Sequence, residues 1–404
     1  MRTTIHANDS KFCGSTRGGR NRAMPYWKAF CALAVFAVLA SNIWSMSRWS
    51  ESRGVYDDVC YLRQAHLFQR FGLGGLDTDI ARDDDHYLSD KLRDIGYASW
   101  SDPAMAPCHV PMPATNNRVL QYPPGTGFVL ALFPAGIQVI PLYAIASVIV
   151  FGVALAAIAE ASTIPALMLA TVFADVAIYL MINPAKASYS MAPTMVVCAL
   201  AGLLTARLFM ASRPGRRVAL TLPVGLLIGL AVDFRLPNLF LASGYLLFFG
   251  FSWLSSRKAE SLLQGAVFGF ACLAGMAPTL LANAINAGSA FSTTYGAADV
   301  TPPDFGFGIV WQYAADTQFV LLALAGAATV LILRRCRGNG IRNVALVTAG
   351  NLVVNLAFFL SHPVFTPYYT VPVAMLSSWS LLFAFLMQPA AAVEGGLLEQ
   401  AAKA

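Results

Sequence analysis

The chain has 404 residues, a length that would make about two to four soluble domains of about 100 to 200 residues each. Its composition argues against that division, because 57% of the residues are hydrophobic and only 12% are charged, about half the charged share of a soluble globular protein. The net charge of +6 would suggest nucleic acid as a partner of a soluble protein, but a chain this poor in charge is better read as a polytopic membrane protein with no nucleic-acid partner.

Long apolar runs recur along the chain, and a bilayer core about 30 Å thick requires about 20 apolar residues of helix. We expect ten crossings, at residues 26–46, 138–160, 164–182, 190–211, 218–233, 238–254, 261–285, 317–333, 343–361 and 369–387. Residues 126–133 are too short to span and are expected to form an interfacial helix, divided from the next span by Pro134 and Pro141.

The predicted fold is therefore an all-α transmembrane domain over residues 26–387, with about ten transmembrane helices. One large outer loop at 47–125 is expected to carry short juxtamembrane helices, and a second outer loop covers 286–316. Residues 1–25 and 388–404 are expected to be cytoplasmic tails.

The basic residues are distributed unequally between the short connections. Placing the N-terminus in the cytoplasm puts ten Lys and Arg residues on the cytoplasmic side and leaves only Lys186 and Arg235 in the short outer connections. Because cytoplasmic loops carry an excess of Lys and Arg, this asymmetry predicts cytoplasmic termini and an outward-facing long loop in the inner (plasma) membrane. The alternative, a cleaved signal peptide at 26–46, fits less well because the apolar run is long enough to span.

The long outer loop is acidic, since 11 of the 21 acidic residues lie between residues 47 and 121. Asp57 and Asp58 precede a stretch with helical spacing, Leu62 to Phe71, which predicts an amphipathic helix on the membrane surface. Simple helix capping is the alternative role for both acids.

Asp83-Asp84-Asp85 is interpreted as a solvated charged loop, because no calcium-loop spacing follows. Binding of a divalent cation there is the unsupported alternative. No metal site is predicted.

Two of the seven cysteines, Cys60 and Cys108, share the outer loop. On an oxidising side of the membrane they form the one candidate disulfide, and two unpaired thiols are the alternative.

Further polar residues gather at the outer ends of the predicted spans. The outer loop closes with Arg118, Tyr122, Pro123, Pro124 and Gly125, where the prolines and glycine predict a rigid turn as the chain re-enters the membrane. Lys186, Arg235, Tyr295, His362 and Tyr368 occupy other outer ends. Ionisable groups at such depth usually face a cavity or a partner, although Lys186 and Arg235 could instead reach to headgroups or pair with an acid such as Asp233.

The order of three motifs resembles the GT-C glycosyltransferases, polytopic enzymes that use polyprenyl-phosphate sugars, such as the lipid A aminoarabinose transferases and the protein O-mannosyltransferases. The motifs are Asp57-Asp58-x-x-Tyr61 after the first span, Tyr122-Pro123-Pro124-Gly125 before the next, and Arg235 in the context Gly-Leu-Ala-Val-Asp-Phe-Arg-Leu-Pro. The resemblance covers about residues 26–240, with a weaker similarity from His362 to Pro372.

This resemblance implies an inverting hexosyl, pentosyl or uronosyl transferase without a required cofactor. It assigns the catalytic carboxylate to Asp57, with Asp58 as the second acid. Donor phosphate and lipid binding fall to Arg235, Lys186, Tyr122 and Arg118, and shaping of the substrate site to Tyr61, Pro123, Pro124, Gly125, Tyr295, His362 and Tyr368. The family has Glu where Asp58 stands, and many relatives have Arg where His362 stands.

The implied partners are a polyprenyl-phosphate sugar as donor, an envelope glycolipid or polysaccharide as acceptor, and the surrounding membrane lipids. A general base such as Asp57 would activate the acceptor hydroxyl, and a cation such as Arg235 would stabilise the phosphate leaving group. Two alternatives remain from other classes. A transporter or lipid flippase would favour repeated halves, which the sequence lacks, and a non-catalytic envelope assembly protein would not require the acidic and basic motifs on one side.

Overall fold

The computed structural model describes residues 23–51, 56–181, 188–295, 303–304, 306–336, 338–362 and 365–388. Of the described residues, 76% are helical and 2% lie in strands, which confirms the mostly helical fold expected from the apolar runs. The expectation of an all-α chain was wrong in one place, because a small β-hairpin forms in the first outer loop.

Within the described residues, six helical segments are long and apolar enough to cross a membrane. They are α1 (Met24–Met46), α5 (Val139–Glu160), α7 (Met191–Met210), α8 (Pro214–Phe234), η4 (Leu236–Ala242) continued by α9 (Ser243–Ser256), and α14 (Asn339–Ser361). Their composition explains this, since each contains an apolar stretch of at least 18 residues with few charges.

Two bent pairs raise the number of candidate crossings to eight if each pair is one crossing. The first is α10 (Ala259–Gly275) with α11 (Ala277–Ala287), bent by 53°, and the second is α12 (Phe307–Ala315) with α13 (Phe319–Arg335), bent by 92°. Two shorter apolar helices are α6 (Ile164–Leu180) and α15 (Val371–Leu386). The continuous helix expected over 261–285 is therefore interrupted.

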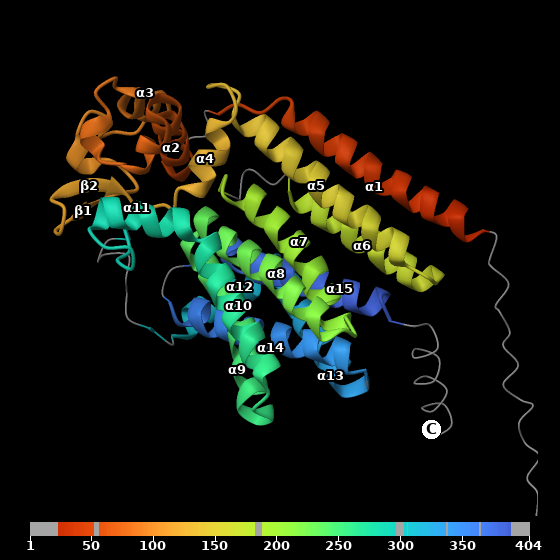
Figure 1. The fold of residues 1–404 in the computed structure, drawn as a ribbon. Helices are drawn as coiled ribbons and strands as arrows, with labels where there is room; N and C mark the ends of the chain where they lie inside the picture. The colour runs from red at the N-terminus through yellow and green to blue at the C-terminus, as the bar shows by residue number, and fades with distance from the viewer. Residues whose placement is uncertain are drawn as a thin grey trace, which may run out of the picture.

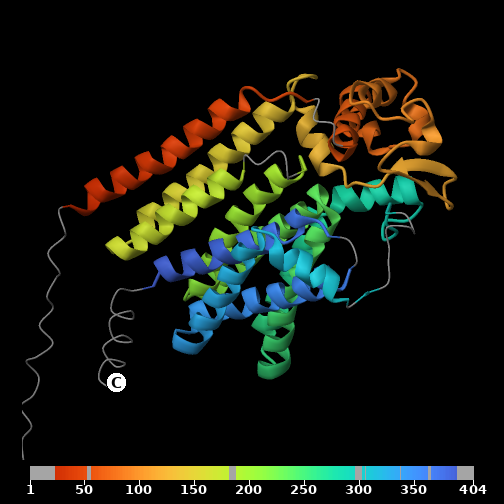
Figure 2. The ribbon, with the colours of Figure 1, turned by 180° about the vertical axis from the view of Figure 1, so that it is seen from behind.

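The apolar helices pack around one large hydrophobic core. α1, α5 and α6 lie side by side along one edge of the bundle, and α5 joins them to α7 (Figure 1). α7 packs between α8 and α15, and α8 packs against α10. α9, α13 and α14 form the remaining side, and the reverse view shows the same grouping (Figure 2).

The first outer loop folds as a compact unit at one end of the bundle (Figure 1). It consists of α2 (Tyr56–Phe71), η1 (Gly72–Leu76), η2 (Ile80–Arg82), α3 (Tyr87–Asp94), η3 (Pro103–Met105), β1 (His109–Met112) and β2 (Asn117–Leu120). The strands are antiparallel, and Val110 faces Val119 in their register. α4 (Gly125–Ala131) then returns the chain to the bundle, and Pro134 separates it from α5, whereas Pro141 lies inside the first turn of α5 and divides nothing.

The helix α2 is not the amphipathic surface helix that the sequence predicts. Ten of its 16 residues are buried, among them the polar residues Arg63 and Gln64. The loop supplies partners for this polar side: the Arg63 guanidinium donates to the carbonyls of Thr78 at 3.0 Å and Asp79 at 2.8 Å, and lies 2.9 Å from Nε2 of His109. The polar side of α2, which its residue types would place in water, is therefore buried against the rest of the loop. Hydrogen bonds to Thr78 and Asp79 compensate for this burial.

A disulfide joins Cys60 to Cys108, which stand 48 positions apart. The candidate disulfide of the outer loop is therefore confirmed. It ties the N-terminal half of α2 to the residue before β1. A cross-link of this span stabilises the fold by restricting the unfolded loop.

Asp84 and Asp85 are exposed, as the interpretation of a solvated charged loop expects, and all three carboxylates of Asp83 to Asp85 also bond local structure. Asp84 forms an ion pair with Arg70, Asp85 lies 2.6 Å from Nε2 of His66, and Asp83 accepts the amide N–H of Leu88 at 2.8 Å. In the described part of the chain, no group of three or more His, Cys, Asp or Glu side chains could hold a metal ion. The cluster fastens α2 to the start of α3.

Candidate functional site

Both acids of the Asp57-Asp58 pair lie in the first turn of α2, and both accept hydrogen bonds from other elements. The Tyr122 hydroxyl donates to Oδ1 of Asp57 at 2.7 Å, and the Tyr189 amide donates to Oδ1 of Asp58 at 3.2 Å. Asp57 is half-buried, whereas Asp58 is only 1% exposed. Asp57 is therefore the more accessible carboxylate, and Asp58 connects α2 to the residues that precede α7.

Tyr122 and Tyr61 form a stacked pair next to Asp57, with ring centroids 4.8 Å apart and planes 20° apart. Tyr61 comes from α2, one turn after Asp57, and Tyr122 stands just before the two prolines that lead into α4. Burial raises the pKa of both phenols well above the ordinary value, and Asp57 raises that of Tyr122 further. Tyr122 therefore stays protonated and remains a hydrogen-bond donor to Asp57.

Arg235 is the basic residue of the site, and it directly follows α8. Its side chain is buried, with 9% exposure. The guanidinium lies over the rings of Tyr368 and Tyr369, at 4.5 and 5.0 Å from their centroids, and one of its nitrogens lies 3.1 Å from the sulfur of Met191. Among the described residues, no carboxylate forms an ion pair with Arg235.

This arrangement overturns two alternatives for Arg235. The side chain does not extend to the membrane surface, because it is buried among aromatic rings. It does not pair with Asp233 either, since the bonded oxygen of that carboxylate accepts from Thr279. A buried cation without a carboxylate partner is costly unless another group compensates its charge, and the faces of two aromatic rings do so only in part.

Electrostatic interactions link these groups into one site. Tyr295 interacts with Tyr61, Arg235 and Asp57, and Tyr368 interacts with Arg235 and Asp57. Burial raises the pKa of Tyr368 to about 12, while nearby Arg235 opposes the shift. We define the tyrosine cluster as Tyr61, Tyr122, Tyr295, Tyr368 and Tyr369. It brings together Asp57 from the first outer loop and Arg235, which lies 178 positions later in the sequence.

The Pro-Pro-Gly turn holds the outer loop against the end of α8. Pro124 is the N-cap residue of α4, and a Cβ added at Gly125 would lie 2.7 Å from the carbonyl oxygen of Asp233. The Thr126 hydroxyl donates to the carbonyl of Phe234 at 3.3 Å. Only glycine fits at position 125, because any side chain there would push α4 away from Arg235 and its neighbours.

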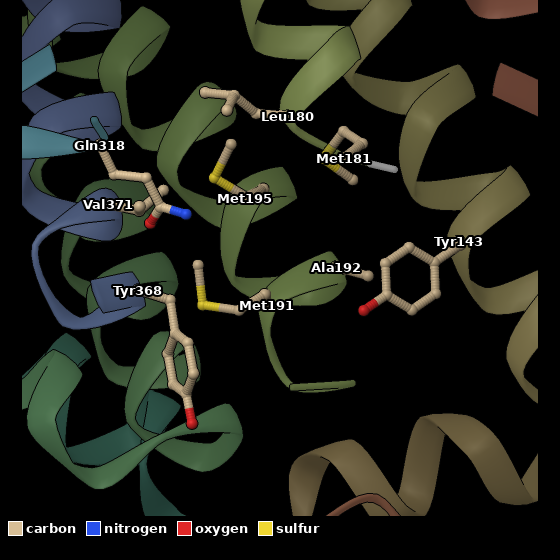
Figure 3. Close-up of a pocket in the computed structure, with 9 residues that line it drawn as sticks. All are labelled: Tyr143, Leu180, Met181, Met191, Ala192, Met195, Gln318, Tyr368 and Val371. Atoms are coloured by element: carbon tan, nitrogen blue, oxygen red, sulfur yellow. The ribbon is translucent and has the colours of Figure 1, made fainter. Parts of the chain in front are cut away.

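A pocket lies among the helices, and two of the residues that line it, Met191 and Tyr368, also contact Arg235 (Figure 3). Met191 and Tyr368, which both contact Arg235, lie next to each other on one side of it, and Tyr143 faces them across the pocket. The remaining lining is largely apolar and comes from Leu180, Met181, Ala192, Met195, Gln318 and Val371. The site is therefore polar around Arg235 and the tyrosine cluster and largely apolar in the pocket.

Three predicted site residues do not join this cluster in the same way. Arg118 lies in β2, and its guanidinium donates to the carbonyl of His109 at 3.1 Å, within the hairpin. The His362 ring is tilted by 34° against that of Phe358, with centroids 3.9 Å apart, and its Nδ1 lies 2.7 Å from the Phe358 carbonyl at the end of α14. Lys186 lies outside the described residues.

Four residues complete the cluster although the sequence analysis did not assign them to the site. Tyr369 provides the second ring over Arg235, Met191 provides a sulfur contact, and Ser188 and Ser190 hydrogen-bond Tyr61. Tyr369 could have been found as the neighbour of Tyr368 in a polar stretch before an apolar run. The sequence gives no signal for Met191, because a methionine at the start of an apolar span looks like any other residue of the hydrophobic core.

No family model matches the sequence, and no curated protein matches it.

Proposed function

We propose that the protein is an integral-membrane glycosyltransferase that moves a sugar from a polyprenyl-phosphate donor to an envelope glycolipid or polysaccharide acceptor, with inversion at the anomeric carbon. The resemblance of its motifs to the GT-C enzymes supports this proposal. The proposal is also supported by the interaction of Tyr61 with both Asp57 and Arg235, the two residues on which that resemblance depends most.

The observation that carries the proposal is the state of Arg235. It is buried, it has no carboxylate partner among the described residues, and it lies at the outer end of an apolar helix beside a largely apolar pocket. An anion is the ligand that such a cation requires. A phosphate attached to a long apolar chain satisfies both the cation and the apolar surroundings.

Asp57 provides the base that the transfer needs. One of its oxygens accepts from Tyr122, and the half-buried carboxylate is open to an acceptor hydroxyl. In the proposed step Asp57 takes the proton of that hydroxyl, whose oxygen then forms a bond to the anomeric carbon. The bond between the anomeric carbon and the phosphate oxygen breaks, and the phosphate leaves with the electron pair. Arg235 stabilises this leaving charge, so no general acid is needed.

The proposed topology places this site on the extracytoplasmic side of the plasma membrane. Ten crossings result if each bent pair and each of the two shorter apolar helices crosses once, in addition to the six long segments. Both termini then face the cytoplasm, and the Lys and Arg asymmetry of the connections supports this orientation. Lys186 would lie on the same outer side as Arg235 and is proposed as a second cation for the donor phosphate.

A binding experiment tests the Arg235 assignment directly. Farnesyl phosphate is titrated into the purified protein in lipid nanodiscs, and binding heat is measured. Arg235→Met is expected to weaken binding by about 10-fold or more, as expected for loss of a charge-assisted hydrogen bond. Asp57→Asn is expected to leave this binding unchanged, because the carboxylate acts on the acceptor.

The matched control is Arg207→Met, which removes an exposed arginine near the end of α7. It is expected to bind farnesyl phosphate as the unmodified protein does. Equal affinity of the Arg235→Met protein and the unmodified protein contradicts the proposed anion site.

A further inference from the structure

α8 packs closely against the bent pair α10 and α11, and we call this contact the seam. At the C-terminal end of α8 the seam reaches the segment that carries Arg235. Gly225, Gly229 and Asp233 follow one another at intervals of one turn along α8. A Cβ added at Gly225 would lie 2.7 Å from the carbonyl oxygen of Phe268, and one added at Gly229 would lie 2.1 Å from that of Cys272. The two helices approach so closely because glycine leaves room for their backbones.

Asp233 lies at the end of this seam and forms hydrogen bonds with the first turn of α11. Its Oδ1 accepts from both the amide N–H of Thr279, at 3.0 Å, and the Thr279 hydroxyl, at 2.5 Å. Thr279 stands directly after the 53° bend, where the first amides of α11 have no partner within their own helix. Asp233 is 1% exposed, so it acts as a buried cap supplied by a neighbouring helix.

The same short segment carries Arg235. The Arg235 amide donates to the carbonyl of Ala231 at 3.1 Å, and the Asn238 amide donates to the carbonyl of Arg235 at 3.0 Å. The Asn238 side chain also holds the Ala231 carbonyl, at 2.7 Å. The Phe234 carbonyl accepts from the Thr126 hydroxyl of α4. Asp233 provides the hydrogen bonds that connect this segment to α11.

We propose that Asp233 is a positioning residue for Arg235: by capping α11 it fixes the end of α8 so that the guanidinium lies over Tyr368 and Tyr369 in reach of a lipid-linked phosphate. This inference rests on the proposed function, because the anion at Arg235 is part of it. Asp233 touches no substrate in this proposal and acts only through the placement of Arg235.

The hydrogen-bond pattern predicts a graded response to substitution. One oxygen, Oδ1, accepts both hydrogen bonds, and Oδ2 has no hydrogen-bond partner among the described residues. Asp233→Asn keeps the accepting oxygen and is expected to weaken farnesyl phosphate binding by less than about 3-fold, whereas Asp233→Ala removes the cap and is expected to weaken it by about 10-fold. Thr279→Val removes one donor and keeps the amide, so an intermediate loss is expected.

A double-mutant cycle separates positioning from general destabilisation. Binding of farnesyl phosphate is measured for the unmodified protein, Asp233→Ala, Arg235→Met and the double variant. Because Asp233 acts through Arg235, the double variant is expected to bind no more weakly than Arg235→Met alone. Losses that add overturn the proposal, as does unchanged binding by Asp233→Ala. If Asp233→Ala does not fold, Thr279→Val replaces it in the same cycle with the same two criteria.

Asp102→Ala is the matched control, since Asp102 caps the start of η3 in the outer loop by accepting the Ala104 amide at 2.9 Å. It is expected to leave binding unchanged. Hydrogen exchange without ligand provides an independent measurement: the amides of Arg235 and Asn238 are expected to exchange faster in Asp233→Ala than in Asp233→Asn or Asp102→Ala. Unchanged exchange overturns the positioning role, whereas faster exchange together with Arg235-independent binding refutes only the proposed anion site.

Discussion

At the scale of single residues, the hydrogen bond between Tyr122 and Asp57 defines the site most sharply. The sequence predicts Tyr122 as a contact of the donor phosphate or lipid, but its hydroxyl donates to the proposed base at 2.7 Å. The two residues stand 65 positions apart, and no local pattern reveals which of several polar residues in the loop will meet. Motif order predicts both as site residues, and only the fold shows that the Tyr122 hydroxyl donates to Asp57.

Tyr122→Phe tests this orientation. The variant keeps the aromatic stack on Tyr61 and loses only the hydroxyl, so Asp57 is held less firmly. We expect kcat for sugar transfer to fall by about 10-fold, the effect of losing a hydrogen bond to a charged group, with KM for the donor nearly unchanged. Steady-state kinetics check this, with Tyr97→Phe, whose hydroxyl bonds the Met105 carbonyl elsewhere in the loop, as the control. An unchanged kcat contradicts the orienting role.

The buried His109 makes the free energy of unfolding depend on pH. Its burial, and then the neighbouring Arg63, lower the pKa from 6.5 to about 3, so the folded chain keeps it neutral. The unfolded chain binds a proton below pH 6.5, and therefore the free energy of unfolding decreases from about pH 6.5 down to about pH 3, by up to about 1.4 kcal/mol per pH unit. Thermal unfolding between pH 7 and 5 is expected to show a smaller loss in His109→Asn. Equal losses in both proteins contradict this account.

At the scale of elements, apolar runs located the helices but not their interruptions. The runs predict α1, α5 and α7 to within a few residues, because length and hydropathy alone determine such segments. They do not predict the bend between α10 and α11, where Pro278 lies in the first turn of α11 and Asp233 of α8 accepts the Thr279 amide. Nor do they predict the hairpin or the enclosure of α2, where distant polar groups such as Arg63 and Thr78 find each other.

Two glycines test the seam between α8 and α10. At Gly229 an added Cβ would meet the Cys272 carbonyl, whereas at Gly250, inside α9, nothing lies within 4 Å. Gly229→Ala is therefore expected to destabilise the fold by about 1 to 3 kcal/mol through overpacking. Gly250→Ala is expected to be neutral or to stabilise by up to about 1 kcal/mol, because alanine favours helix. Midpoints of thermal unfolding compare the two, and equal effects contradict the seam.

At the scale of the whole molecule, the distribution of charge determines more than its amount. The low charged fraction indicates a membrane protein, and the residues that the structure describes include six to eight candidate crossings of sufficient length and apolarity. The acidic residues collect in a folded unit at one end of the bundle, where most of them stabilise local structure. Asp57 and Asp58 are the acids that interact with the tyrosine cluster, and the proposed function rests on this pair and not on Asp83 to Asp85.

The most direct test of the proposed activity uses the purified protein in lipid vesicles. A panel of radiolabelled polyprenyl-phosphate sugars is supplied together with envelope glycolipid and polysaccharide extracts, and the label is followed by chromatography. We predict that one of these sugars moves to an acceptor, and that Asp57→Asn, inserted at the same level, transfers at least about 100-fold more slowly. Label that stays on the donor throughout the panel, label that only crosses the bilayer, or transfer at full rate by Asp57→Asn contradicts the account.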